Sequence, residues 1–234
     1  MRIDQQPAFL LHTRPYRETS LLLEAFTREY GRVGLVARGV RRERSRMPRG
    51  VLQPLQPLLL GWVARGELGT LTAAETASAP LRLAGDALLA AMYVNELVLR
   101  LVGRNDAHAA AFGAYAQCVA RLGEGESIAW TLRRFERDLL SDIGYAIVRG
   151  GAAAEAPLDA GSCYAYDPDA VLVEVEGSAG TASISGEALI ALERDEQPGP
   201  AQLAELRRLA RTVIRHLAGG DLNAWSMTRA PGIR

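Results

Sequence analysis

The chain has 234 residues, of which 48% are hydrophobic and 23% are charged, and its 27 basic residues equal its 27 acidic ones. These proportions are ordinary for a soluble globular protein and allow one large domain or two small ones. No apolar run approaches the roughly 20 residues that a membrane-spanning helix needs, and we expect no secretion signal. Two cysteines, Cys118 and Cys163, lie far apart without a C-x-x-C motif, which predicts a reducing cytoplasm and no disulfide scaffold.

Charge is unevenly distributed along the chain. Residues 1–65 contain 12 arginines and 5 acids, whereas residues 150–200 contain one arginine and 10 acids. Seven arginines fall between Arg32 and Arg49, with Glu43 as the one acid among them. Such a positive segment favours a nucleic-acid backbone as the partner, because each neutralised phosphate releases counterions. The alternative is a solvated arginine-rich loop, since all 27 basic residues are arginine.

The first 76 residues have the sequence pattern of short strands. Extended segments are predicted at 8–14, 20–27, 32–39, 51–63 and 69–75. Pro54 and Pro57 place the beginning of the fourth segment at an edge, or in a bend before pairing starts. In the third, the period-two alternation places Val33, Leu35 and Ala37 on one face, and Arg32 and Arg38 on the other. Five short strands in under 80 residues favour a small closed barrel of the OB-like Greek-key type.

After Pro80 the pattern becomes helical. Helices are predicted at 86–102, 107–122, 127–143 and 200–219. Ser127 is placed to cap the third helix and Pro200 occupies the favoured first position of the last one. An apolar stripe on the third helix is expected to leave Arg133, Arg134 and Arg137 outside the buried face.

The segment at 163–186 is rich in turn residues and is expected to form a small hairpin. The predicted fold class is therefore α+β, with an N-terminal OB-fold β-barrel followed by a mainly α-helical C-terminal domain that carries a small hairpin excursion. The predicted boundaries are 1–80 for the nucleic-acid-binding barrel and 81–234 for the helical domain, to which we assign partner binding.

Motifs of catalysis are nearly absent from the sequence. A phosphate-binding P-loop needs a lysine, and the chain has none. The three histidines are scattered, and Asp167-Pro-Asp169 is more typical of a turn than of a cation site. No nucleophile and base can be paired, so we expect a binding protein and not an enzyme.

Two predicted loops of the barrel are basic. Arg14-Pro15-Tyr16-Arg17 joins the first two strands, and residues 40–50 join the third and fourth. In OB-like barrels the loops between strands flank the face that takes single-stranded nucleic acid. Tyr16 offers a ring for base stacking, although a ring folded over the barrel end is an equal alternative. Composition does not distinguish DNA from RNA.

Five strings, in this order, closely resemble the bacterial RecO family of DNA-repair proteins and recombination mediators: AFLLHTRPYRETSLLLEAFTREYGRVGLVARGVRR, LQPLQPLLLGW, RGELGTLTAAE, YVNELVLRL and LRRFERDLLSDIGY. The resemblance spans the chain and is most specific over residues 7–75. It implies an OB fold, a helical C-terminal domain, binding of single- and double-stranded DNA, annealing of complementary strands and a nucleoid-associated place in the RecFOR pathway. It also implies that the protein, together with its partner RecR, helps to load RecA onto DNA covered by single-strand-binding protein.

The resemblance and the charge pattern together indicate two sets of site residues. The candidate DNA-binding residues are Arg14, Tyr16, Arg17, Arg32, Arg38, Arg41, Arg42, Arg44, Arg46 and Arg49. The family also docks the acidic tail of single-strand-binding protein, which ends in a phenylalanine carboxylate, on its helical domain. The candidates for that contact are Leu132, Arg133, Arg134, Phe135 and Arg137. Core packing for the two apolar residues and helix-surface ion pairs for the arginines remain alternatives.

Some RecO proteins hold a zinc ion with four cysteines in the C-terminal domain. Here only Cys163 lies in the corresponding region, and a tetrahedral structural site needs four ligands. We therefore expect neither zinc nor another cofactor. A protein–protein adaptor and an RNA-binding OB protein remain open as alternative functions; no membrane partner is expected.

Overall fold

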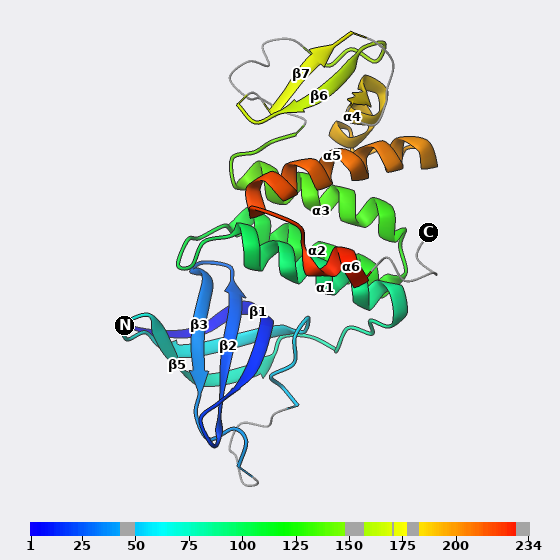
Figure 1. Cartoon of the computed structure of the whole chain (residues 1–234). Helices are drawn as coiled ribbons and strands as arrows, with labels where there is room; N and C mark the ends of the chain where they lie inside the picture. The colour runs from blue at the N-terminus through cyan, green and yellow to red at the C-terminus, as the bar shows by residue number, and fades with distance from the viewer. Residues whose placement is uncertain (43–49, 148–156, 170, 177–182, 228–234) are drawn as a thin grey trace. The chain divides into compact units, whose positions relative to one another are not determined.

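The computed structural model describes residues 1–42, 50–147, 157–169, 171–176 and 183–227. The chain forms two compact units, residues 1–123 and residues 124–234. The first unit contains strands β1 to β5 with helices α1 and α2, and the second contains the elements from α3 onward (Figure 1). Among the described helices, none has both the length and the apolar character needed to cross a membrane.

The first unit begins with a closed barrel in the strand order β1-β2-β3-β5-β4. The strands are β1 (Arg2–Tyr16), β2 (Ser20–Thr27), β3 (Gly31–Ala37), β4 (Pro57–Val63) and β5 (Leu68–Thr76). Neighbouring strands pair antiparallel except β3 and β5, which pair in parallel where the barrel closes. The predicted OB-like barrel is confirmed.

The barrel core follows from the period-two alternation of the strands. Leu10, Leu23, Leu35 and Leu60 are completely buried inside it. On β3 the predicted alternation is confirmed, because Val33, Leu35 and Ala37 are buried while Arg38 is exposed and Arg32 is half-buried. The alternation therefore leaves arginine side chains on the outer face of the barrel.

Two strand boundaries differ from the prediction. β1 begins at Arg2 instead of Ala8, and its pairing with β4 shifts between Ile3 and Gln6, where Gln5 has a φ of +54°. This bulge breaks the alternation that would have revealed the early strand. β4 begins only at Pro57, and the turns within residues 51–56 correspond to the bend that Pro54 and Pro57 allowed before pairing starts.

The helices α1 (Gly85–Leu101) and α2 (Ala109–Glu124) complete the first unit. The rings of Phe9 and Phe26 from the barrel contact those of Phe112 and Tyr115 from α2, with ring centroids 4.9–5.9 Å apart. This aromatic cluster binds α2 to the barrel, so the compact unit extends to Gly123. The predicted boundary at residue 80 lies between β5 and α1. The assignment of nucleic-acid binding to residues 1–80 and of partner binding to residues 81–234 stays a prediction.

The second unit combines helices with a small sheet. Its elements are α3 (Ile128–Asp142), β6 (Cys163–Asp167), β7 (Val171–Val175), β8 (Ser183–Ser185), α4 (Gly186–Glu193), α5 (Pro200–Ala218) and α6 (Asn223–Met227). The predicted hairpin is confirmed as the antiparallel pair β6–β7, to which β8 adds a third strand. The Ser127 side chain accepts a hydrogen bond from the backbone N–H of Trp130, as the capping prediction required.

One predicted helix face needs correction. On α3, Arg133 was expected outside the buried face, yet it is buried together with Glu136. The reason is that Arg133 and Glu136 stand three positions apart on one helix and neutralise each other, so the pair enters the interior together.

Candidate nucleic-acid interface

The outer face of strands β1, β2 and β3 carries three of the seven described DNA-binding candidates, Arg14, Tyr16 and Arg32. Strand register sets them in rows: Arg14 pairs with Leu22, and Leu22 pairs with Val36. The next row toward the end of the barrel contains Tyr16, paired with Ser20. Because alternate residues of a strand point to the same side, one face carries these side chains.

A hollow of about 460 Å³ lies at the end of this face, and we call it the basic hollow. Its walls come from the β1–β2 turn, the end of β3, the segment that follows β3, and the start of β5. It is lined by Tyr16, Arg17, Thr19, Ser20, Val36, Arg38, Gly39, Arg42, Leu68, Gly69 and Thr70. Four residues predicted from the sequence, Tyr16, Arg17, Arg38 and Arg42, thus meet around one depression.

Two contacts shape the basic hollow. The backbone N–H of Arg41 donates to the carbonyl oxygen of Thr19 at 3.0 Å, which ties the segment after β3 to the β1–β2 turn. The guanidinium carbon of Arg17 lies 5.3 Å from the centroid of the Tyr16 ring. The Tyr16 ring is half-buried, so it is positioned by a cation–π contact at the rim of the hollow.

Of the remaining arginines in the predicted loop, Arg41 and Arg42 are described, and both are exposed. Arg44, Arg46 and Arg49 lie outside the described residues.

A second hollow of about 250 Å³ lies on the same outer face, and we call it the glutamate hollow. It is lined by His12, Arg14, Leu22, Leu23, Glu24, Arg32, Leu99 and Arg104. Glu24 accepts two hydrogen bonds from Arg104, at 3.0 and 2.5 Å, and pairs with Arg32 Nε at 2.9 Å. Arg32 also donates to the carbonyl oxygen of Leu99, so this predicted DNA-binding residue is engaged within the protein.

Sequence reasoning did not find Arg104, which follows α1 and has no arginine neighbours. The connection that carries Arg104 depends on Gly31 of β3. A Cβ atom on Gly31 would lie 1.7 Å from the carbonyl oxygen of Asp106, two residues after Arg104. Glycine in a strand indicates such close approaches, but it does not say which segment approaches. The pKa of Arg104 is raised, mainly by its hydrogen bond to Glu24 and next by the negative charge of Glu24.

The five candidates for docking an acidic tail do not share one environment. Arg133 is buried and directs its guanidinium onto Glu136, with Nε to Oε2 at 2.6 Å. Phe135 is a buried core residue, and Leu132 is half-buried. The structure therefore separates Arg133 and Phe135 from the more accessible arginines of the same helix.

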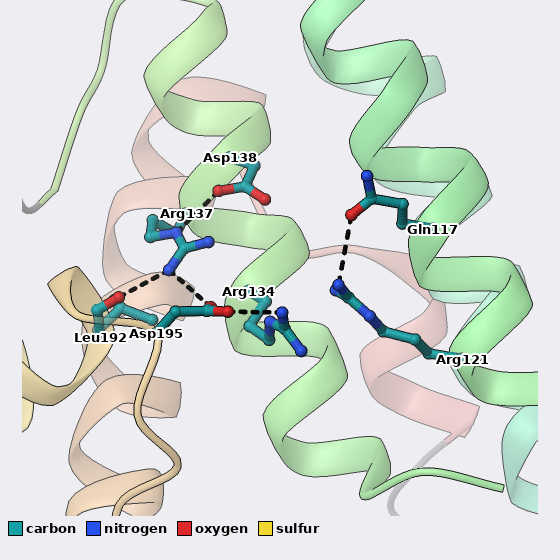
Figure 2. A network of polar contacts seen from close by, with 7 residues as sticks. All are labelled: Gln117, Arg121, Arg134, Arg137, Asp138, Leu192 and Asp195. Atoms are coloured by element: carbon teal, nitrogen blue, oxygen red, sulfur yellow. Dashed lines mark hydrogen bonds and ion pairs between the residues drawn. The ribbon is translucent and has the colours of Figure 1, made fainter. Parts of the chain in front are cut away.

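Arg134 and Arg137 are brought together by one carboxylate, as Figure 2 shows. Asp195 accepts from Arg134 Nη2 at 2.5 Å through one oxygen and from Arg137 Nη1 at 3.0 Å through the other. Arg137 also donates to the Leu192 carbonyl at 2.7 Å and pairs with Asp138 at 2.7 Å. Burial opposes the charge of Arg137, but the contacts with Asp138 and Asp195 outweigh it, and its pKa is raised.

In the described part of the chain, no group of three or more histidine, cysteine or acidic side chains is arranged to hold a metal ion. Cys163 is buried in β6 and Cys118 in α2, and neither forms a disulfide.

The fold and these surfaces define an OB-fold barrel protein with an arginine-rich outer face and a helical C-terminal part. The chain belongs to the RecO family, because residues 1–80 match the family "Recombination protein O N terminal" and residues 82–226 match "Recombination protein O C terminal". The resemblance found in the sequence is thereby confirmed.

Proteins named "DNA repair protein RecO" are similar to this chain over nearly its whole length. The protein of Stenotrophomonas maltophilia (strain K279a) is 42% identical over 231 residues, which cover 97% of each chain. That of Nitrosococcus oceani is 45% identical over 231 residues, covering 96% of this chain and 92% of the relative. That of Ralstonia nicotianae is 40% identical over 225 residues, covering 95% and 82%. A role in DNA repair and recombination follows from membership in this family.

Proposed function

We propose that this protein is a recombination mediator that binds single-stranded DNA across the outer face of its barrel. In this proposal it also binds double-stranded DNA, anneals complementary strands and, with RecR, helps to load RecA onto DNA covered by single-strand-binding protein. The observation that carries the DNA-binding step is the basic hollow, which Arg17, Arg38 and Arg42 line together with Tyr16.

The chemistry of the basic hollow suits a single strand. Guanidinium groups donate paired hydrogen bonds to phosphate oxygens, and an accessible aromatic ring stacks on a base of any sequence. Within the described residues, Arg38 and Arg42 form no ion pair, so their charge is available to phosphates. Arg32 is different, because Glu24 already neutralises it.

The proposal is tested by fluorescence anisotropy of a labelled single-stranded oligonucleotide across a salt series. The variant is Arg38→Ala with Arg42→Ala, and the matched control is Arg28→Ala with Arg65→Ala, which removes the same charge from exposed positions elsewhere on the barrel. If both hollow arginines contact phosphates, the slope of log K against log[salt] should flatten by about 1.4 in the variant only. Equal behaviour of the two double variants would contradict a DNA site at the basic hollow.

The same titration separates the alternative functions. An RNA-binding OB protein would prefer an RNA strand of equal length and sequence, and a protein–protein adaptor would show no affinity that depends on Arg38 and Arg42. Strand annealing is measured separately with complementary labelled oligonucleotides, with and without RecR.

For the helical unit we propose that Arg134 and Arg137 receive the terminal carboxylate of the single-strand-binding protein tail. The contact with Asp195 supports this proposal, because its side chain is also a carboxylate and already binds both arginines. Arg134 Nε is buried and has no hydrogen-bond partner among the described residues, so Asp195 does not use the full donor capacity of this guanidinium. Arg133 is less suited to the role, because Glu136 already neutralises it.

We further propose that the protein acts by binding and not by catalysis, and that it does so without zinc. The support is the missing P-loop lysine and the single cysteine, Cys163, in the region where some relatives have four. Elemental analysis of the purified protein that found stoichiometric zinc would contradict the second part.

A further inference from the structure

Arg104 reaches the outer face of the barrel from the connection between α1 and α2. The N–H of Asn105 donates to the carbonyl oxygen of Arg32 at 2.9 Å, so this connection runs beside the start of β3. The absence of a side chain at Gly31 permits the approach. A cation from outside the barrel strands is therefore fixed beside the predicted DNA-binding residues.

The basic hollow and the glutamate hollow belong to one continuous face. Leu22 lines the glutamate hollow, Val36 lines the basic hollow, and the two residues are register partners on β2 and β3. From Arg32 to Arg38 the strand direction covers about 20 Å at about 3.4 Å per residue. That length lies within the reach of the 4–16 nucleotides, roughly, that an OB fold covers.

The arginines of the glutamate hollow are not equally held. Arg32 and Glu24 have side chains only 15% and 12% exposed, whereas that of Arg104 is 46% exposed. Arg14 is exposed and, within the described residues, forms no ion pair. Three arginines thus line the hollow that contains Glu24, and two of them, Arg14 and Arg104, present their charge to solvent.

We propose that Arg104 and Arg14 form a second phosphate contact for the same DNA strand that enters the basic hollow. Glu24 is the positioning residue of this contact: its two hydrogen bonds hold Arg104 on the barrel face, and its charge offsets part of the arginine charge. A strand long enough to cross from one hollow to the other engages both. This inference rests on the proposed single-stranded DNA binding of the barrel.

The inference predicts the loss of one phosphate contact when Arg104 is removed. For the full-length protein carrying Arg104→Ala, the salt slope should flatten by about 0.7 with a long strand of about 16 nucleotides. Arg82→Ala, which removes an exposed charge elsewhere in the first unit, is the control. If Arg104→Ala binds the long strand with the same affinity and the same salt slope as this control, the inference is overturned.

Glu24→Gln gives a test that loss of folding cannot imitate. The amide oxygen of glutamine can still accept a hydrogen bond from Arg104, so the position of Arg104 is kept while the negative charge is lost. Binding of the long strand should therefore tighten and its salt slope steepen by up to about 0.7, because more arginine charge faces the phosphates. Weakened or unchanged binding by a Glu24→Gln protein that melts at the wild-type temperature would overturn the inference. If Arg104→Ala unfolds, this variant alone decides.

The outcomes separate this inference from the proposed function. If wild-type protein binds no single strand, or if Arg38 and Arg42 are dispensable, the proposed DNA site fails. If those arginines matter while Arg104→Ala equals its control, the DNA site stands and the second contact is absent.

Discussion

The hydroxyl group of Tyr115 donates a hydrogen bond to Asn95 Oδ1 across 2.5 Å, and both residues are buried. Asn95 in turn donates through Nδ2 to the carbonyl oxygen of Leu11 at 3.1 Å. A residue of α2, a residue of α1 and a barrel strand are therefore joined in one polar chain inside the first unit. This connection explains why a polar residue occupies the buried position 95 in the string YVNELVLRL.

Removing the tyrosine hydroxyl should destabilise the protein. Tyr115→Phe takes the donor away from Asn95 Oδ1, and a buried acceptor that loses its donor costs about 1–3 kcal/mol. Urea unfolding followed by circular dichroism measures this difference. Tyr16→Phe, at the rim of the basic hollow, is the matched control and should stay within about 0.5 kcal/mol of the wild type. Equal stability of the two variants would contradict a structural role for the Tyr115–Asn95 pair.

The same tyrosine predicts a pH dependence. Burial raises the pKa of Tyr115 far above its ordinary value near 10. Above that value the unfolded chain releases the phenolic proton while the folded protein keeps it, so the folded state binds more protons and its stability falls as the pH rises. Urea unfolding at pH 9 and pH 11 should show a larger loss for the wild type than for Tyr115→Phe. A loss of the same size in both proteins would argue against this origin.

Local patterns in the sequence were sufficient for much of the fold. The alternation of Val33, Leu35 and Ala37 indicated the inner face of β3, and Ser127 marked the start of α3, because both signals depend on neighbouring residues only. The bulge at Gln5 was hidden, since one extra residue reverses the alternation before and after it.

The candidate site was predictable only in part. The charge run pointed to Arg38 and Arg42, which the fold brings together with Tyr16 and Arg17. Arg104 could not be found in this way, because it joins the face through a tertiary contact with Glu24, 80 positions away in sequence. The carboxylate partner of Arg134 was equally hidden, since Asp195 is 61 positions away.

The buried pair on α3 should be sensitive to removal of one partner. Glu136→Gln leaves the buried Arg133 guanidinium without the carboxylate it faces, which should cost about 3–5 kcal/mol of unfolding free energy. Changing both residues to methionine should restore most of the stability, because no buried charge remains. Asp221→Asn, which breaks the exposed pair with Arg215, should cost less than about 1 kcal/mol. Chemical unfolding of the variants checks this order, and a double variant as unstable as Glu136→Gln would refute it.

Asp195 should compete with an acidic peptide for Arg134 and Arg137. Asp195→Asn removes the negative charge between them, so a peptide carboxylate should bind more tightly, whereas Arg134→Ala should weaken binding. Asparagine is the suitable replacement because Asp195 has a φ of +59°, a conformation that asparagine tolerates. Calorimetry with an acidic peptide ending in phenylalanine provides the measurement, and Asp221→Asn is the charge-matched control. If the Asp195 variant binds no more tightly than the control, the peptide carboxylate does not use this arginine pair.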